Sequence, residues 1–314
     1  MNLPTLSDIR AAHARIMPFI HWTPVLSSVQ LDSIFGCNMF FKCENFQKAG
    51  AFKFRGATNA ILSLSDDEKR KGVVTHSSGN HAAALALAGR MNGVKSYIVM
   101  PENAPVVKKN AVAGYGGEIT FCRPTLEARE ETTRVIMKET GATLVHPYDN
   151  FNVICGQGTA ALELLEGKDD LDIVIAPVGG GGLLSGTSTT VKNIDSKIRI
   201  YAAEPLNASD AYRSFNSGNI VPSVNPKTVA DGLLTSLSPL TFAVIRKNVD
   251  AIFTATEESI IECMLLVWER MKIIIEPSSA TVLAIIKENP EAFRGKKVGL
   301  IISGGNVDFR KLPF

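Results

Sequence analysis

Short apolar runs alternate with longer stretches of helical character along most of this 314-residue chain. The runs expected to form strands are 73–75, 96–100, 118–121, 143–146, 173–178, 198–202, 251–254 and 298–302. The stretches expected to form helices are 54–64, 81–92, 106–115, 126–140, 156–165, 183–192, 257–272 and 278–288. Most of the strand runs are continuously apolar, which is typical of parallel strands covered by helices on both faces. The pattern predicts an α/β fold.

The length of the chain favours two domains over one, because it exceeds the usual size of a single core. Residues 70–148 form a compact series of strand–helix pairs and are expected to be a small domain. Residues 1–69 and 149–314 would then form a larger, discontinuous domain. A cleft between two such domains is the expected place for a ligand.

Charge and hydropathy exclude several classes of protein. The 33 Lys and Arg residues nearly balance the 31 Asp and Glu residues, so a nucleic-acid partner is not expected. No apolar run approaches the roughly 20 residues that span a bilayer, and Asp8, Arg10 and His13 occupy the place of a signal peptide. We expect a soluble, cytoplasmic protein without a membrane partner. The chain has five cysteines, an odd number, and no pair of them has CxxC spacing. We therefore expect neither a disulfide framework nor a structural zinc site.

A lysine between two aromatic residues is the first candidate for chemistry. Lys53 lies between Phe52 and Phe54, close to the start of an expected helix. Partial desolvation lowers the pKa of a lysine, and a neutral amine can form an imine with an aldehyde. The alternative is a surface lysine whose stem packs along the two rings.

Two turns that each follow an apolar run could bind anions. The first turn lies between the apolar run 73–75 and the helix expected at 81–92, and it contains Ser77, Ser78, Gly79, Asn80 and His81. Free backbone N–H groups at the start of such a helix favour a carboxylate or phosphate. Simple helix capping is the alternative there.

The second turn contains Gly179, Gly180, Gly181 and Gly182, followed by Leu183. Its spacing fits neither the P-loop nor the dinucleotide fingerprint. Four glycines leave the backbone N–H groups open to a phosphate, which is the interpretation that we favour.

Two further groups are weaker signals by themselves. Ser303 ends the last apolar run and precedes two glycines. Glu204 and Asp210 are spaced so that they could bind a hard cation, although solvated loop carboxylates are the commoner explanation.

Taken in order along the chain, these motifs resemble the fold-type II pyridoxal-phosphate (PLP) enzymes of the serine racemase and serine/threonine dehydratase family. The similarity runs from Thr23 to Asp308. It implies two lobes, each with a mostly parallel twisted sheet flanked by helices, and the cofactor in the cleft between them. It also implies a homodimer.

The resemblance assigns roles to the candidate residues. It implies that Lys53 holds PLP covalently beside Phe52, that the 179–183 turn binds its phosphate, and that Asn80, Glu276 and Ser303 contact its ring. The residues that it places around the substrate are His76, Ser77, Ser78, Asn80, His81, Tyr115 and Arg129. Glu204, the backbone of Ala208 and Asp210 match the family's site for Mg²⁺ or Ca²⁺.

Ser78 separates the two branches of the family. Dehydratases usually carry alanine at this place, whereas racemases carry serine, as here. Racemisation needs two proton-transfer groups on opposite faces of a planar carbanion, and Lys53 and Ser78 would be that pair. Arg129 could pair with a second substrate carboxylate.

Other positions depart from the racemase pattern. Gln30, Ala49 and Ala83 replace different residues of the family's nucleotide-binding surface, which counts against activation by ATP. Tyr148 looks more like the dehydratase version.

We therefore expect an enzyme that racemises serine and dehydrates serine or a related β-hydroxy amino acid to a 2-oxo acid and ammonia. The alternatives are a dedicated L-threonine/L-serine ammonia-lyase or 3-hydroxyaspartate dehydratase, a β-replacement synthase, and a non-catalytic amino-acid-binding protein.

Overall fold

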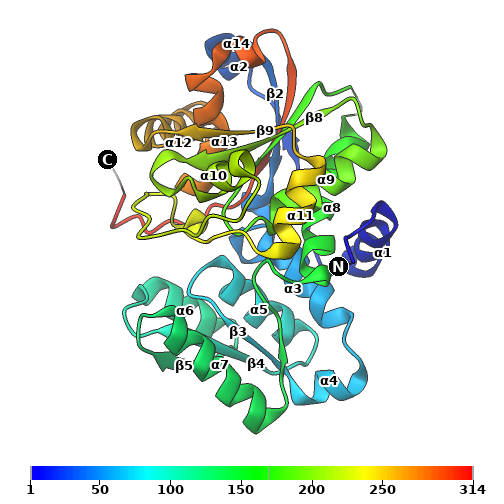
Figure 1. The fold of residues 1–314 in the computed structure, drawn as a ribbon, viewed down its shortest axis with the longest axis vertical. Coiled ribbons are helices and arrows are strands. Elements are labelled where there is room, and N and C mark those ends of the chain that lie inside the picture. The colour runs from blue at the N-terminus through cyan, green and yellow to red at the C-terminus, as the bar shows by residue number, and fades with distance from the viewer. Residues whose placement is uncertain (1, 169, 313–314) are drawn as a thin grey trace.

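The computed structural model of the protein describes residues 2–168 and 170–312. Its strands form two sheets that lie in separate parts of the molecule, one above the other in Figure 1. The larger sheet has the order β1-β2-β10-β7-β8-β9, and the smaller has the order β5-β4-β3-β6. The mostly parallel α/β fold expected from the sequence is confirmed.

The larger sheet combines strands from both ends of the chain. Its strands are β1 (Val25–Leu26), β2 (Asn38–Cys43), β7 (Ile173–Pro177), β8 (Arg199–Pro205), β9 (Ala251–Ala255) and β10 (Lys297–Ile302). All neighbours run parallel except β1 and β2, which are antiparallel. The apolar-run analysis missed β1 and β2. The reason for β2 is that the charged Lys42 interrupts its apolar residues, yet this side chain is fully buried.

The smaller sheet is parallel throughout and is built from one continuous part of the chain. Its strands are β3 (Val73–His76), β4 (Ser96–Pro101), β5 (Glu118–Cys122) and β6 (Thr143–Leu144). Each of these strands overlaps a run that the sequence predicts as strand.

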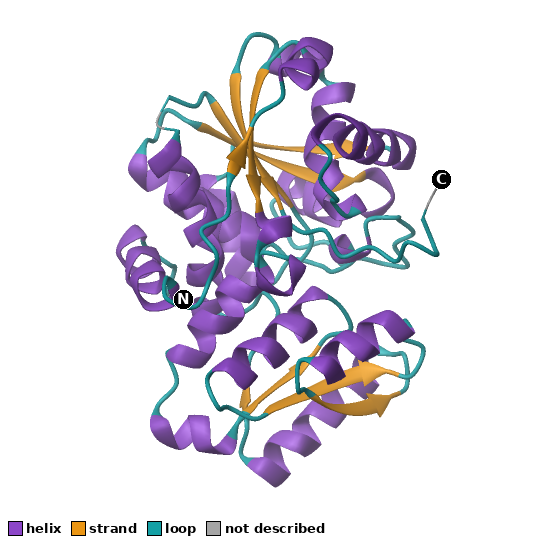
Figure 2. Cartoon of the chain, turned by 180° about the vertical axis from the view of Figure 1, so that it is seen from behind, coloured by secondary structure: helices purple, strands orange, loops and turns teal. Residues whose placement is uncertain are grey.

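Helices cover both sheets, as Figure 2 shows from behind. Those of the first half are α1 (Leu6–Ile16), α2 (Val29–Phe35), α3 (Lys53–Leu62), α4 (Asp66–Lys71), α5 (Asn80–Met91), α6 (Val106–Gly114) and α7 (Leu126–Thr140). Those of the second half are α8 (Phe151–Gly167), α9 (Gly182–Ile194), α10 (Asp210–Ser217), α11 (Pro239–Asn248), α12 (Glu257–Met271), α13 (Pro277–Glu288) and α14 (Pro290–Phe293). No helix in the described part of the chain is long and apolar enough to cross a membrane.

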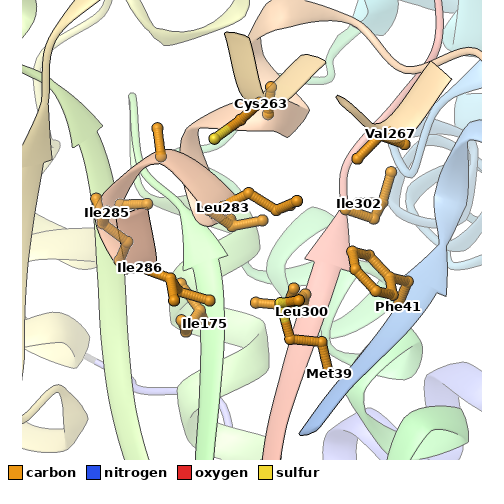
Figure 3. Packing of buried hydrophobic residues seen from close by; sticks show 14 of the residues in the cluster. Met39, Phe41, Ile175, Cys263, Val267, Leu283, Ile285, Ile286, Leu300 and Ile302 are labelled. Atoms are coloured by element: carbon orange, nitrogen blue, oxygen red, sulfur yellow. The ribbon is translucent and has the colours of Figure 1, made fainter. Parts of the chain in front are cut away.

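The core of the larger sheet fixes the strands that end at the site. On one face, Met39, Phe41 and Leu300 pack under Val267 of α12 and Leu283 of α13, as Figure 3 shows. Helices α8 and α9 contribute apolar side chains to a second buried cluster with strands of the same sheet. Because the sheet is held between two helical layers, the carboxyl ends of β7 and β10 have fixed positions.

Candidate active site

A cavity of about 360 Å³ contains residues from both sheets and from the helices between them. It brings together almost all of the residues that the sequence singled out. These are Phe52, Lys53, His76, Ser77, Ser78, Asn80, His81, Arg129, Gly179, Gly180, Gly181, Gly182, Leu183, Glu276 and Ser303. Of the residues expected around the cofactor and the substrate, Tyr115 does not line this cavity, and the expected cation-site residues Glu204, Ala208 and Asp210 lie outside it as well.

Lys53 is the first residue of α3, and its amine points into this cavity. The backbone N–H of Phe52 donates to the carbonyl oxygen of Ser303 at 2.9 Å, which ties the start of α3 to the end of β10. The Nζ of Lys53 donates to the carbonyl oxygen of Pro147 at 2.8 Å and lies 5.1 Å from the centre of the Phe52 ring. Burial lowers the pKa of Lys53 to about 8, although the carboxylate of Glu276 opposes this shift. The amine is therefore easier to deprotonate than an ordinary lysine, as imine formation requires.

The glycine turn lies between β7 and α9 and is closely packed. A Cβ on Gly180 would lie 2.3 Å from the ring of Tyr148, and one on Gly181 would lie 2.8 Å from Thr241. Gly181 also has a φ of +87°, which favours glycine. The glycines are thus required by neighbours within the protein as well as by any close ligand.

The start of α9 supports an anion site independently of its glycine content. Gly181 caps α9 without a side-chain hydrogen bond. Among the described residues, the N–H groups of Gly180, Gly181 and Gly182 donate to no protein acceptor. Free N–H groups and the positive end of the helix dipole favour a phosphate at this position.

Asn80 and Glu276 form a polar pair in the cavity wall. The Nδ2 of Asn80 donates to both carboxylate oxygens of Glu276, and its Oδ1 accepts from the Nδ2 of Asn306 at 3.0 Å. Burial raises the pKa of Glu276 to about 7, against the effect of the Asn80 hydrogen bond. This carboxyl group can therefore hold or release a proton near neutral pH.

Ser303 lies just beyond β10 and has a defined partner. Its hydroxyl lies 3.0 Å from the hydroxyl of Ser279, which also donates to the carbonyl oxygen of Gly304 at 2.7 Å. Ser303 thus presents a neutral hydroxyl to the cavity, held by the buried Ser279, without the permanent charge of a carboxylate.

The turn between β3 and α5 supplies the small polar groups. Ser77 and Ser78 line the cavity before Gly79, the N-cap of α5, which makes no side-chain capping hydrogen bond. His81 is buried, and its Nε2 lies 3.1 Å from the carbonyl oxygen of Val145, so this nitrogen carries the proton. Burial lowers the pKa of His81 to about 3, so its ring is neutral.

His76 and Arg129 lie on the small-sheet side of the cavity. Burial, and then the charge of Arg129, lowers the pKa of His76. Its ring makes an edge contact with that of His146, with centroids 5.3 Å apart. The neutral imidazole and the guanidinium therefore give this end of the cavity a positive charge that suits a carboxylate.

Tyr115 lies instead on a second cavity of about 310 Å³. Ala49, Ala83, Tyr115 and Asn306 all line it, and the ion pair between Lys108 and Asp231 lies beside both cavities. The placement of Tyr115 near the substrate, which the resemblance implied, thus has no support from the cavity geometry.

The carboxylates expected at a cation site are both buried. The two oxygens of Glu204 accept from the backbone N–H groups of Ala211 and Tyr212 at 2.8 and 2.7 Å, and burial raises the pKa of this group to about 8. Neither oxygen of Asp210 accepts a hydrogen bond of normal geometry from a described residue, and burial raises the pKa of Asp210 to about 6 against the effect of the nearby Ser223 hydroxyl. Ala208 is buried in the short turn between them. Orphaned buried carboxylate oxygens fit a divalent cation, although no cluster of three His, Cys, Asp or Glu side chains occurs among the described residues.

Sequence reasoning missed several residues of the site. Ser279 is the partner of Ser303, and Asn306 is the partner of Asn80. The sequence singles out Tyr148 only as a dehydratase-like residue and does not indicate that it packs on Gly180. Ser279 lies three residues after Glu276, and this proximity could have drawn attention to it. The pairing of Asn306 with Asn80 depends on a contact across 226 positions, which no local pattern indicates.

The site defines a class of enzyme. The amine of lowered pKa at Lys53 fits an aldehyde. The helix starts of α3, α5 and α9 have no side-chain cap and fit an anionic phosphate, and the neutral hydroxyls of Ser279 and Ser303 fit a heteroaromatic ring. These groups fit pyridoxal phosphate.

Comparison with known proteins agrees with this fit. The family model of pyridoxal-phosphate dependent enzymes matches residues 16–304, and the chain belongs to this family. A serine racemase of Dictyostelium discoideum is 54% identical, with 99% of this chain and 98% of the relative covered. A beta-hydroxyaspartate dehydratase of Paracoccus denitrificans is 51% identical, with 100% of both chains covered. A solved structure of maize serine racemase has 45% identity and a TM-score of 0.97, with 98% of this chain and 95% of that chain covered.

Proposed function

We propose that this PLP-dependent enzyme racemises serine and eliminates water from serine or a related β-hydroxy amino acid. Loss of water leaves an enamine, which tautomerises to an imine and is hydrolysed by one water to a 2-oxo acid and ammonia. The observation that carries the proposal is that Ser78 and Lys53 line one cavity, together with the uncapped turns that suit a phosphate and a carboxylate.

Proton transfer is divided between two side chains. Bound pyridoxal phosphate supplies an electron sink that stabilises negative charge on the substrate Cα. The Nζ of Lys53 takes or returns the α-proton on one face, and its lowered pKa makes the neutral amine accessible. The Oγ of Ser78 does the same on the other face. Residues of the 77–81 turn bind the substrate carboxylate, and His81 keeps that turn in place through its bond to Val145.

The phosphate and the ring of the cofactor would be bound by residues from both parts of the molecule. We assign the 179–183 turn to the phosphate, Asn80 and Glu276 to the ring and its substituents, and Ser303 to the ring nitrogen. Because Ser303 is neutral and pairs with Ser279, it leaves the ring a milder electron sink than a carboxylate would. A milder sink favours local reprotonation and elimination over transamination.

A second candidate is a dehydratase for 3-hydroxyaspartate. Arg129 lines the cavity and can pair with a second carboxylate of the substrate. The two activities share the same first proton transfer, so one site can support both.

Several finer assignments belong to the same proposal. Glu204, the carbonyl of Ala208 and Asp210 would hold Mg²⁺ or Ca²⁺, supported by the orphaned oxygens of Asp210. Residues 70–148 would form the small domain, with 1–69 and 149–314 as the large one, and two copies would form a homodimer.

A chiral product assay tests the proposal. The PLP-loaded enzyme is incubated with L-serine, D-serine, L-threonine and 3-hydroxyaspartate, with and without Mg²⁺. We expect D-serine and pyruvate from L-serine, together with a visible absorbance band that is lost in Lys53→Ala. Elimination without any D-serine would leave only the dehydratase, and a colourless protein after incubation with PLP would contradict the whole assignment.

A further inference from the structure

The face of α3 that does not meet the cavity carries a buried ion-pair network. The side chains of Lys42, Glu44 and Arg55 have no exposed surface, and Glu163 is 1% exposed. They come from β2, the turn after it, α3 and α8. Two positive and two negative charges balance within the network. None of the four lines the active-site cavity.

Arg55 is the centre of this network and binds two carboxylates. Its Nε and Nη2 donate to Glu44 at 2.6 and 2.8 Å, and its Nη1 and Nη2 donate to Glu163 at 2.6 and 2.7 Å. Nη1 also lies 3.2 Å from the hydroxyl of Thr159. Such two-sided bidentate geometry is specific to the planar guanidinium, and a lysine ammonium cannot reproduce it.

Lys42 completes the charge balance on the other side of Glu163. Its Nζ donates to Glu163 at 2.5 Å and to the carbonyl oxygen of Thr23 at 2.6 Å. Burial works to raise the pKa of Glu163, but hydrogen bonds from His13 and Arg55 and the nearby charges bring it down to about 2. The carboxylate therefore stays ionised across the working pH range.

The same helix α8 is in backbone contact with α3. A Cβ on Gly156 of α8 would lie 2.6 Å from the Cα of Gly56 in α3. Neither residue tolerates a side chain without a shift of one helix. The contact lies next to Arg55, so helix packing and ion pairs fix the same point of α3.

A second contact of this kind joins α8 to α9. A Cβ on Gly186 of α9 would lie 2.5 Å from the backbone nitrogen of Gly158, and the hydroxyl of Thr190 donates to the carbonyl oxygen of Gly158 at 3.0 Å. Two glycines of α8, Gly156 and Gly158, therefore contact two different helices. Gly156 contacts α3, which begins with Lys53, and Gly158 contacts α9, which begins at the glycine turn.

We propose that Arg55 is a positioning residue, whose double clamp by Glu44 and Glu163 fixes the register of α3 on α8 and thereby places Lys53 at the correct distance from the phosphate-binding turn of α9. Buried ion pairs contribute little net stability, because desolvation offsets their attraction, and setting register is their best-attested use. The proposal rests on the assignment of Lys53 as the residue that binds the cofactor aldehyde.

Two cofactor forms distinguish positioning from stability. Pyridoxal phosphate can bond to Lys53, whereas pyridoxamine phosphate carries an amine in place of the aldehyde and depends on the turn and the ring contacts alone. In Arg55→Lys, which preserves the charge, we expect the affinity of the apoprotein for pyridoxal phosphate to fall at least about tenfold, since displacements near 1 Å have effects of this size. The affinity for pyridoxamine phosphate should change less than about twofold, because α9 keeps its own contacts with α8.

A charge-balanced double variant covers the case in which Arg55→Lys does not fold. Lys42→Met combined with Glu163→Gln removes one charge of each sign, and it also removes one of the two carboxylates that bind Arg55. Val267→Ala, in the core between α12 and the large sheet, is the control for a general loss of stability.

The ratio of the two affinities decides between the outcomes. The ratio is the affinity for pyridoxal phosphate divided by the affinity for pyridoxamine phosphate. In Arg55→Lys and in the double variant this ratio should move toward the value for Lys53→Ala, whereas in Val267→Ala it should equal the wild-type value. Equal losses for both ligands, an unchanged ratio with only a lower melting temperature, or the same change in Val267→Ala would overturn the proposal. If Lys53→Ala itself left the ratio unchanged, the assignment of Lys53 would fail instead.

Discussion

Asn80 and Glu276 meet in the wall of the cavity, with the Nδ2 of Asn80 2.9 and 3.1 Å from the two carboxylate oxygens of Glu276. Asn80 begins α5, which follows a strand of the small sheet, and Glu276 precedes α13, which packs on the large one. The pair therefore joins the two parts of the molecule through a carboxyl group whose pKa burial raises to about 7. Protonation of Glu276 changes the charge at this junction near neutral pH.

The stability of the apoprotein should depend on pH through Glu276. Between about pH 5 and pH 7, the unfolded chain has released this proton while the folded protein holds it, so the free energy of unfolding falls as pH rises. A shift from the ordinary 4.5 to about 7 corresponds to about 3 kcal/mol at most over that interval. In Glu276→Gln this contribution is absent, and denaturation with urea at several pH values should give a shallower decline.

Glu118→Gln is the control for that measurement, because Glu118 is exposed and pairs with Lys95 at the surface. It should keep the wild-type slope. Identical slopes for Glu276→Gln and the wild type would contradict the raised pKa.

Ser78→Ala should separate the two reactions of the enzyme. The variant lacks one of the two proton-transfer groups, so the rate of conversion between L- and D-serine should fall by about 10²–10⁴-fold. Pyruvate formation from L-serine should persist, because it uses Lys53 for the α-proton. Chiral chromatography of serine and a coupled assay of pyruvate on the same sample measure both. A parallel loss of the two products would show that Ser78 acts in binding and not in proton transfer.

The parts of the site that could be predicted from the sequence are those with a local signature. Lys53 between two phenylalanines, the polar turn at Ser77 and Ser78, and the four glycines each combine unusual residues within a few positions. Parallel strands then bring such turns to the carboxyl edges of the sheets, so their meeting in one cavity follows from the fold.

The parts that could not be predicted depend on contacts between distant residues. Lys42 is buried because Glu163, 121 positions away, neutralises it, and without that partner its charge argues against a strand at β2. Gly180 is required by the ring of Tyr148, which no pattern around the glycines indicates. The role of Tyr115 near the substrate rests on resemblance alone and stays a prediction, since Tyr115 lines the second cavity, which shares Asn80 with the first.

Divalent cations should stabilise the protein through Asp210. Mg²⁺ or Ca²⁺ would bind the two buried oxygens, which accept no hydrogen bond of normal geometry within the described part of the chain, so either cation should raise the melting temperature. Asp210→Asn should abolish this rise, since an amide is a weaker ligand without charge. Asp250→Asn is a matched control, because Asp250 is a partly exposed carboxylate that pairs with Lys192. A rise of equal size in Asp210→Asn would place the cation elsewhere.

Arg129 should determine whether the enzyme accepts a dicarboxylic substrate. Its guanidinium reaches the cavity from α7, next to the neutral ring of His76, and is not neutralised there by an ion pair with a carboxylate among the described residues. Removing a charged partner of a substrate carboxylate costs about 1.5–3 kcal/mol, or roughly 10–100-fold in kcat/KM. Arg129→Met should therefore lose this factor with 3-hydroxyaspartate and change serine elimination by less than about threefold. Arg134→Met is the control on the same helix, since Arg134 is exposed and pairs with Glu131. Steady-state kinetics with both substrates measure the difference, and an equal loss with serine would mean that Arg129 supports the reaction in general and does not read the second carboxylate.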